Sequence, residues 1–224
     1  MPKFADIKGF AFDLDGVITD TARLHGQAWR QTADTVGTPW TAELAESLKG
    51  ISRLESLEMI LAAGGHANDY TEREKEALAD EKNEAYQELI KTLTPADILP
   101  GMGDFIRDAV AQGYRLSIAS ASKNAPAILN NLGLTKYFIG IVDPATLSAG
   151  KPDPEIFVRA AAVLDLPNEQ IIGLEDSAAG IKSINAAGQT SLGIAAAGVL
   201  PEAKLHFTAT SQVTLATIAT KMNQ

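Results

Sequence analysis

The chain of 224 residues contains no cysteine. This absence excludes disulfide bonds, thiolate metal sites and cysteine nucleophiles, and it is typical of a cytoplasmic protein. Long hydrophobic runs are also missing, because no apolar stretch approaches the roughly 20 residues of a membrane-spanning helix. The first residues lack the apolar segment of a signal peptide. We therefore expect a cytoplasmic location and no membrane partner.

Basic residues are scarce relative to acidic ones. The sequence has 19 Lys and Arg against 28 Asp and Glu, which gives a formal net charge of −9. Such a balance argues against nucleic acid as a partner, although a few local cations can still bind a small anionic substrate. Apolar residues make up 46%, so the chain can bury a sizeable core. Nothing in the sequence requires a dimer, and we expect a monomer.

Two aspartates follow the first strand-like run of the chain. Residues 7–12 are mainly apolar and predict a short buried strand, and Asp13 and Asp15 come directly after it. Side chains two residues apart on an extended chain point the same way, so both carboxylates would emerge at the carboxyl end of the strand. They repel each other unless a cation or a reaction requires them. The alternative is a plain hairpin turn at Asp15-Gly16, but the sequence that follows is helical.

The rest of the chain divides into two parts with different sequence patterns. Residues 20–93 read as almost purely helical, and Thr71 to Glu74 has the form of a capping box. Beyond Pro95, strands alternate with helices, which predicts a parallel sheet covered on both faces. We expect strands at 115–119, 140–142, 171–174, 190–194 and weakly 206–208, and helices near 102–112, 125–132, 154–164, 177–187 and 213–222.

This pattern predicts an α/β fold in which a three-layer, doubly wound parallel sheet forms a Rossmann-like core. The core would comprise residues 1–19 and 94–224, and residues 20–93 would form an inserted helical cap domain. Because the insertion directly follows the paired aspartates, we expect it to act as a lid over the site.

A second acidic pair, Glu175 and Asp176, also follows an apolar strand and precedes a helix. Four carboxylates at one sheet edge, with no histidine cluster, favour a hard cation with oxygen ligands, and Mg²⁺ fits best. The alternative is local: Asp176 or Ser177 could simply cap the next helix, with Glu175 complementing its dipole.

Two further segments could hold a phosphate group. Ser120-Ala121-Ser122-Lys123-Asn124 follows a strand, where hydroxyls, an amide and free backbone N–H groups suit an anion. Ser122 or Asn124 could equally serve as a helix cap. Lys151 lies in a stiff loop after the third strand. A lone lysine is usually a solvated surface charge, but its neighbours at the same sheet edge favour a place in the site.

Within the insertion, Lys49-Gly50-Ile51-Ser52-Arg53 joins two helices and could clamp an anion. Its alternative is a helix end at Gly50 followed by a cap at Ser52. Lys82 lies at the edge of an apolar stripe, a place from which a lysine either points into a cleft or snorkels outward; the pattern alone favours snorkelling. His25 lies one turn beyond Thr21 and could reach the acid there, although a lone histidine is more often structural.

Together these segments resemble the haloacid dehalogenase-like superfamily of phosphotransferases over the whole chain. The four ordered motifs of that superfamily correspond to Asp13-Leu14-Asp15-Gly16-Val17, Ser120, Lys151 and Glu175-Asp176, and the insertion resembles its small helical cap. The likeness is nearest to the mutases that interconvert β-D-glucose 1-phosphate and glucose 6-phosphate. It is carried by residues 13–21 with His25 and Trp29, and by 48–53 with Ser56-Leu57, 120–124 and 173–177. No functional position of the family departs from the pattern, whereas Gly150 before Lys151 and Gly26-Gln27 beside His25 are unusual for it.

The resemblance implies a Mg²⁺-dependent phosphotransfer isomerase. Asp13 would be the nucleophile that forms an aspartyl phosphate, and Asp15 the general acid and base, whose timing His25 and Thr21 would control. β-Glucose 1,6-bisphosphate would be the intermediate, and glucose 1,6-bisphosphate the phosphoryl primer. Mg²⁺ would be held by Asp13, the Asp15 main-chain carbonyl, Glu175 and Asp176. The sugar phosphate would be bound by Thr21, His25, Trp29, Lys49, Gly50, Ile51, Ser52, Arg53, Ser56, Lys82, Ser120, Ala121, Ser122, Lys123, Asn124 and Lys151.

Within this implied set, Ser120 and Lys151 would hold the transferring phosphoryl group, and Arg53, Ser122 and Asn124 the distal phosphate. The main alternative is a sugar-phosphate phosphatase on the same scaffold, which would share every core residue. A non-catalytic phosphosugar-binding module is disfavoured because it needs no nucleophile. A dehalogenase is disfavoured because it has no use for the acidic pair Glu175-Asp176.

Overall fold

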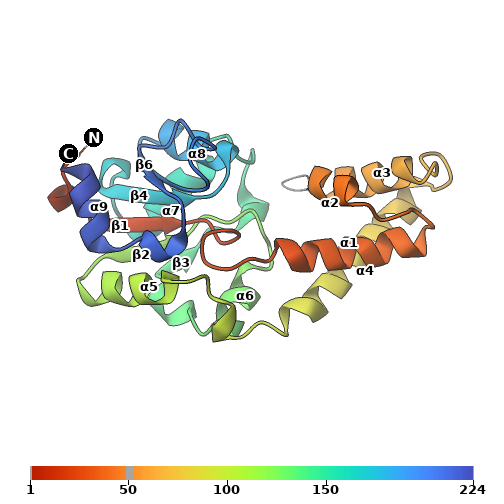
Figure 1. Cartoon of the computed structure of the whole chain (residues 1–224), viewed down its shortest axis with the longest axis horizontal. Coiled ribbons are helices and arrows are strands. Elements are labelled where there is room, and N and C mark those ends of the chain that lie inside the picture. Colours follow the sequence, from red (N-terminus) through yellow and green to blue (C-terminus); the bar gives the residue numbers. More distant parts are fainter. Residues whose placement is uncertain (1, 49–52, 224) are drawn as a thin grey trace. The chain divides into compact units, whose positions relative to one another are not determined.

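The computed structural model describes residues 2–48 and 53–223. Its centre is a six-stranded parallel sheet with the strand order β3-β2-β1-β4-β5-β6 (Figure 1). The strands are β1 (Gly9–Phe12), β2 (Arg115–Ile118), β3 (Gly140–Ile141), β4 (Ile171–Glu175), β5 (Thr190–Ile194) and β6 (Leu205–Phe207). The order reverses direction between β1 and β4, which is where doubly wound sheets bind ligands. The predicted α/β fold class is confirmed.

Helices cover both faces of the sheet, so the central strands β1, β4 and β5 are buried on both sides. One face packs against α7 (Glu155–Leu164) and α8 (Ala178–Ala186), and the other against α5 (Met102–Ala111) and α9 (Leu215–Met222). The helix α6 (Ala125–Asn131) follows β2. Single-turn 3₁₀ helices lie at Phe4–Asp6, Pro95–Asp97, Thr135–Tyr137, Pro144–Thr146, Asn168–Gln170 and Thr210–Gln212.

The sequence of β1 explains why the two faces differ. Alternate residues of a strand point to opposite faces. Phe10 and Phe12 therefore point to one side, where the Phe10 ring meets the Phe105 ring of α5 edge-on at 5.2 Å between centroids. Ala11 points to the other side and joins an aliphatic cluster with Ala160 and Ala161 of α7. Aromatic rings therefore pack on the α5 side of the sheet. On the opposite side, small side chains at the contact let α7 lie close to β1.

The helical insertion has a core of its own. It consists of α1 (Ala22–Thr35), α2 (Ala42–Ser47), α3 (Arg53–Ala63) and α4 (Glu72–Ile90). Trp29, Leu57, Ile60 and Leu61 are buried together in this core. The expected capping box is present, because the Thr71 hydroxyl accepts the Glu74 N–H while Glu74 accepts the Thr71 N–H. This reciprocal pair fixes the start of α4.

Contacts divide the chain into two compact units, Met1–Asp20 with Leu93–Gln224 and Thr21–Thr92. Asp20 and Leu93, which the sequence prediction gave to the insertion, fall in the unit that holds the sheet. The strand expected at 140–142 is shorter by one residue, and Asp143-Pro144 then opens a 3₁₀ turn. No helix within the described ranges is both long and apolar enough to cross a membrane.

Candidate active site

The paired aspartates lie where β1 ends. The Asp13 N–H donates to the Leu174 carbonyl of β4 at 3.0 Å, so the strand ladder continues as far as the first carboxylate. The chain then turns tightly: Gly16 has a φ of +71°, and its N–H donates to the Thr19 carbonyl at 2.9 Å. Asp13 is 8% exposed and Asp15 is partly buried. A compact loop, rather than a hairpin with a second strand, therefore presents both acids.

Lys151 is buried between two carboxylates. Its ammonium lies 2.6 Å from Asp13 Oδ1 and 2.6 Å from Glu175 Oε1. The side chains of these three residues are only 12%, 11% and 2% exposed, respectively. The surface-charge interpretation of Lys151 is therefore wrong, since a cation this deeply buried needs such partners.

Glu175 is held at both oxygens. Its Oε2 accepts from the Asp176 N–H, the Ser177 N–H and the Ser177 hydroxyl at 2.8–2.9 Å. The same hydroxyl accepts the Gly180 N–H at 3.0 Å and caps α8. The capping interpretation of this segment is thus correct for Ser177, and it coexists with the carboxylate cluster. A Cβ on Gly180 would overlap the Glu175 carboxylate, so the glycine makes room for this acid.

Asp13, Glu175 and Asp176 each offer an oxygen, and these oxygens lie within 4.8 Å of one another. Hard oxygen donors at this spacing fit Mg²⁺. Gly16 supports the same fit, because a Cβ there would overlap the Asp176 carboxylate. Asp15 is not among the three clustered carboxylates, and its place as a ligand through the main-chain carbonyl remains a prediction.

The close carboxylates perturb one another's protonation. Burial raises the pKa of Asp13 to about 7, against the lowering effect of Lys151 and with the help of Glu175. Desolvation, and then the charges of Glu175 and Asp13, raise the pKa of Asp176 to about 7. Burial alone would lower the pKa of Lys151, but Asp13 and Glu175 outweigh it and raise that pKa. The cluster therefore carries a cation at its centre and two acids that are easily protonated.

The polar segment after β2 starts beside the first aspartate. The Ala119 N–H donates to the Phe12 carbonyl at 2.7 Å, so the two strands end together. Ser120 is 4% exposed, and its hydroxyl accepts the Ser122 N–H at 3.1 Å. The Ser122 hydroxyl accepts the Asn124 N–H at 3.2 Å, just before α6. Ala121 and Lys123 are exposed. These contacts form a turn that brings hydroxyl groups to the same sheet edge as Asp13.

In the helical unit, Lys82 is buried in an aromatic cluster and does not snorkel, contrary to the expectation from its helical stripe. Its ammonium lies 4.6 Å from the centroid of the Trp29 ring and 5.0 Å from that of Tyr86. It also lies 2.9 Å from His25 Nδ1, and the His25 ring stacks on Tyr86 at 3.9 Å. Cation–π attraction and a nitrogen lone pair replace the water that the ammonium loses.

This arrangement determines the state of the histidine. Burial, followed by the charges of Lys82 and Arg53, lowers the pKa of His25 to about 3. Burial, followed by Arg53, lowers the pKa of Lys82 to about 8. Because an ammonium has only donors, Nδ1 of His25 must accept, and its Nε2 carries the proton. His25 is therefore a neutral ring with one fixed donor.

Other predicted cap residues have varied surroundings. Thr21 is 2% exposed and precedes α1. Ser56 is 1% exposed, and its hydroxyl has no hydrogen-bond partner in the part of the chain that the structure describes. The Arg53 guanidinium donates to Asn83 Oδ1 at 3.1 Å and lies 3.6 Å from Asp80 Oδ1. Four predicted positions, Lys49, Gly50, Ile51 and Ser52, lie outside the described residues.

Sequence reasoning missed the aromatic and amide partners of these cations. Tyr86 is four residues after Lys82 on α4, and this helical spacing could have placed its ring beside the ammonium. Asn83 adjoins Lys82 in sequence, but nothing marked it as the partner of Arg53.

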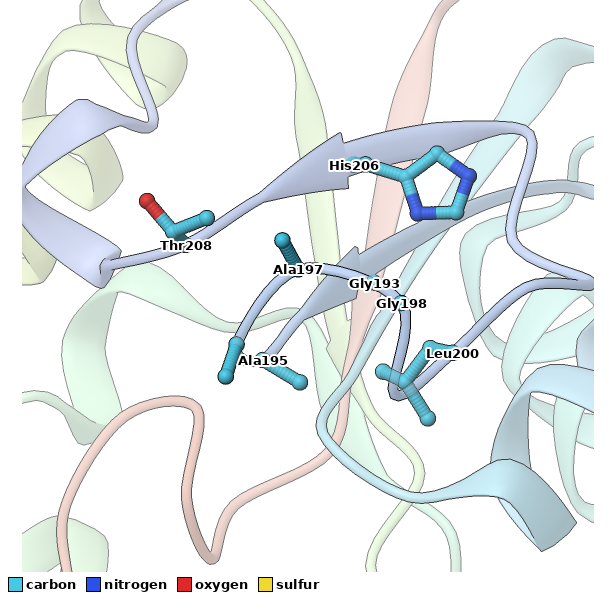
Figure 2. Close-up of a pocket in the computed structure, with 8 residues that line it drawn as sticks. Gly193, Ala195, Ala197, Gly198, Leu200, His206 and Thr208 are labelled. Atoms are coloured by element: carbon cyan, nitrogen blue, oxygen red, sulfur yellow. The ribbon is translucent and has the colours of Figure 1, made fainter.

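A separate hollow lies at the carboxyl-terminal ends of β5 and β6 (Figure 2). It measures about 380 Å³ and is lined mainly by small residues such as Ala195, Ala197 and Gly198, with the His206 ring on one side. Gly193, another lining residue, pairs with Glu175 in the strand register. No lysine or arginine is among the described residues that line it, so the hollow does not resemble a phosphate site.

Comparisons with known proteins identify the relatives of this chain. The model of the haloacid dehalogenase-like hydrolases matches residues 7–188. The chain is 45% identical over 209 residues to a β-phosphoglucomutase of Bacillus subtilis, covering 93% of this chain and 92% of the relative. It is 30% identical over 179 residues to a phosphorylated carbohydrates phosphatase of Thermotoga maritima, covering 79% and 80%. The crystal structure of a β-phosphoglucomutase from Clostridium difficile has a TM-score of 0.87 at 42% identity, covering 97% of each chain.

The raised pKa values predict that Mg²⁺ competes with protons. Below about pH 7, Asp13 and Asp176 become protonated, and the affinity should fall about tenfold per carboxyl between about pH 8 and pH 6. Titration calorimetry in buffers of different ionisation enthalpy measures both the affinity and the protons released. Asp104→Asn, a change of an exposed acid on α5, should leave both unchanged. An affinity independent of pH would contradict the assignment.

The geometry around His25 predicts that this ring stays neutral from about pH 5 to pH 8, with the proton on Nε2. In ¹⁵N-labelled protein, the signals that disappear in His25→Gln should show the shifts of this tautomer without titrating. In Lys82→Met the midpoint should rise, because the nearby positive charge is gone. A wild-type midpoint near the ordinary histidine value of about 6.5 would refute the arrangement.

Proposed function

The chain belongs to the haloacid dehalogenase-like hydrolase family as a β-phosphoglucomutase-like enzyme, and we propose that it interconverts β-D-glucose 1-phosphate and glucose 6-phosphate with Mg²⁺. The observation that carries the phosphotransfer chemistry is the buried contact of Asp13 with Lys151, beside two further carboxylates. The choice of a mutase is supported by the 45% identity to the Bacillus subtilis enzyme over nearly the whole chain.

In the first half-reaction, an oxygen of the Asp13 carboxylate attacks the phosphorus atom of one phosphate of bound glucose 1,6-bisphosphate. The new bond joins the Asp13 oxygen to phosphorus, and the bond from phosphorus to the sugar oxygen breaks. Asp15 gives its proton to that sugar oxygen, which leaves as a hydroxyl group. The products are an aspartyl phosphate on Asp13, an ionised Asp15 and a sugar that keeps its other phosphate.

In the second half-reaction, the free C6 hydroxyl group of a β-glucose 1-phosphate molecule attacks the aspartyl phosphate, which regenerates glucose 1,6-bisphosphate. Asp15 takes the proton of this hydroxyl, the bond from phosphorus to Asp13 breaks, and the free carboxylate returns. Starting from glucose 1,6-bisphosphate as primer, the two half-reactions transfer a phosphoryl group to Asp13 and then back to a sugar. The bisphosphate is therefore not consumed overall. General acid–base help of this kind contributes about 10²–10⁴-fold.

Charge neutralisation is the second requirement of the reaction, since an anionic carboxylate approaches an anionic phosphate. A bound Mg²⁺, held by Asp13, Glu175, Asp176 and the Asp15 carbonyl, would supply electrostatic stabilisation of this charge. Lys151 holds a positive charge at Asp13 in the protein itself. The hydroxyl of Ser120 and the N–H near Ala121 would bind the other oxygens of the transferring group.

The remaining predicted residues would recognise the sugar phosphate. Arg53, Ser122 and Asn124 would hold the distal phosphate, and Lys82 and residues 50–52 would contact the sugar. Trp29 is buried against Lys82 and would orient this ammonium. The fixed Nε2 donor of His25, together with Thr21, would control when Asp15 acts. That the enzyme works as a cytoplasmic monomer remains a prediction from composition.

A sugar-phosphate phosphatase is the second candidate, and the 30% identity to the Thermotoga maritima phosphatase favours it. Both reactions would begin with the same attack by Asp13. They differ in the acceptor of the aspartyl phosphate, which is a sugar hydroxyl in the mutase and water in the phosphatase.

A coupled assay decides between the two. With β-glucose 1-phosphate, Mg²⁺ and a trace of glucose 1,6-bisphosphate, we expect rapid formation of glucose 6-phosphate with little inorganic phosphate and no product from the α anomer. Asp13→Asn should lower turnover by about 10⁴-fold or more without unfolding the chain, whereas Asp108→Asn, an exposed acid on α5, should not. Phosphate release in proportion to substrate loss would make the protein a phosphatase.

A further inference from the structure

The guanidinium of Arg53, the first residue of α3, faces two side chains of α4 that differ in charge. One nitrogen donates to the neutral amide oxygen of Asn83 at 3.1 Å. Another lies 3.6 Å from the Asp80 carboxylate, beyond the usual range of a hydrogen bond. Asp80 and Asn83 are three residues apart, so they project from neighbouring places on the same side of the helix.

These two contacts are unequal in what they can do. The hydrogen bond from Arg53 to Asn83 fixes the direction of the guanidinium. The contact with Asp80 joins side chains that are 39% and 77% exposed, and ion pairs of this kind add little to stability. Asp80 therefore places a negative charge beside Arg53 without fixing the geometry of the guanidinium. A structural role alone explains this contact poorly.

We propose that Asp80 competes with the distal phosphate of the substrate for Arg53, and that Asn83 positions the guanidinium for that phosphate. The proposal rests on the proposed function, in which Arg53 binds the distal phosphate. A phosphate that docks on Arg53 must do so against the charge of Asp80. An arginine has five donors, so its contact with Asn83 can persist while the others turn to the phosphate.

The chemistry of the reaction gives such a competitor a use. Glucose 1,6-bisphosphate must exchange its two ends between the half-reactions, so neither phosphate can be held too tightly at the distal site. A carboxylate within the same helical unit lowers the affinity of Arg53 for whichever phosphate occupies the distal site. Asp80 thus tunes the affinity of Arg53 for the distal phosphate, and Asn83 acts as a positioning residue.

The two roles predict effects of opposite sign on the binding of glucose 6-phosphate. Asp80→Asn should tighten binding about two- to fivefold, the range expected of an exposed charge contact. Asn83→Ala should weaken it, because the guanidinium loses its orienting acceptor. If both side chains merely supported the fold, both changes would weaken binding.

The test is calorimetric titration of glucose 6-phosphate into the full-length protein with Mg²⁺ and without bisphosphate primer, so that no turnover occurs. Glu84→Gln is the matched control, because it removes the same charge from an exposed position of the same helix. Arg53→Ala and the double variant Arg53→Ala/Asp80→Asn complete a thermodynamic cycle, and thermal unfolding of each variant reports on the fold.

We expect tighter binding in Asp80→Asn, no change in Glu84→Gln, and no effect of the Asp80 change once Arg53 is alanine. Equal tightening in Glu84→Gln, unchanged or weaker binding in Asp80→Asn, or a tightening that survives without Arg53 would overturn the competitor role. Unchanged binding in Asn83→Ala would overturn the positioning role. Full affinity in Arg53→Ala would overturn both, whereas isomerisation in the coupled assay would still uphold the proposed function.

Discussion

The candidate site depends on one buried ion-pair cluster, in which the Lys151 ammonium lies between the Asp13 and Glu175 carboxylates at 2.6 Å from each. Removing three charged groups from water is costly unless each is paired. The fold meets this requirement at three strand ends: Asp13 directly follows β1, Glu175 is the last residue of β4, and the loop after β3 supplies Lys151.

The surrounding residues make this cluster possible. The Ser183 hydroxyl of α8 donates to the Asp153 carbonyl at 2.6 Å and anchors the loop that carries Lys151. Three donors at one Glu175 oxygen hold that carboxylate in place while its other oxygen faces the ammonium. Glycines at positions 16 and 180 leave space for the acids. Packing, capping and charge pairing therefore all determine the position of a few oxygen atoms.

The helical unit solves a similar problem with different chemistry. Lys82 has no carboxylate partner in its described contacts, and aromatic rings with a histidine nitrogen take that place. Without a counter-charge, burial and Arg53 lower the pKa of Lys82 to about 8, whereas the two carboxylates raise that of Lys151. Two buried lysines in one chain thus differ in proton affinity because their partners differ.

The sequence predicts some of these features and not others. The alternation of strands and helices predicts the doubly wound sheet, and parallel strand ends share one edge, so the meeting of Asp13, Ser120, Lys151 and Glu175 follows. The burial of Lys82 does not follow, because the helical stripe of α4 says nothing about the Trp29 ring that α1 places over it. The sequence does not predict the neighbours of Arg53 for the same reason, since α3 and α4 meet only in the folded chain.

The central claim is that Asp13 accepts the phosphoryl group, and the most direct measurement is mass spectrometry of the acid-quenched enzyme after mixing with glucose 1,6-bisphosphate and Mg²⁺. We predict a single phosphoryl group on the peptide that contains Asp13, labile to hydroxylamine as an acyl phosphate is, and absent from Asp13→Asn. A phosphoryl group on any other residue, or active enzyme that never carries one under these conditions, would contradict the account.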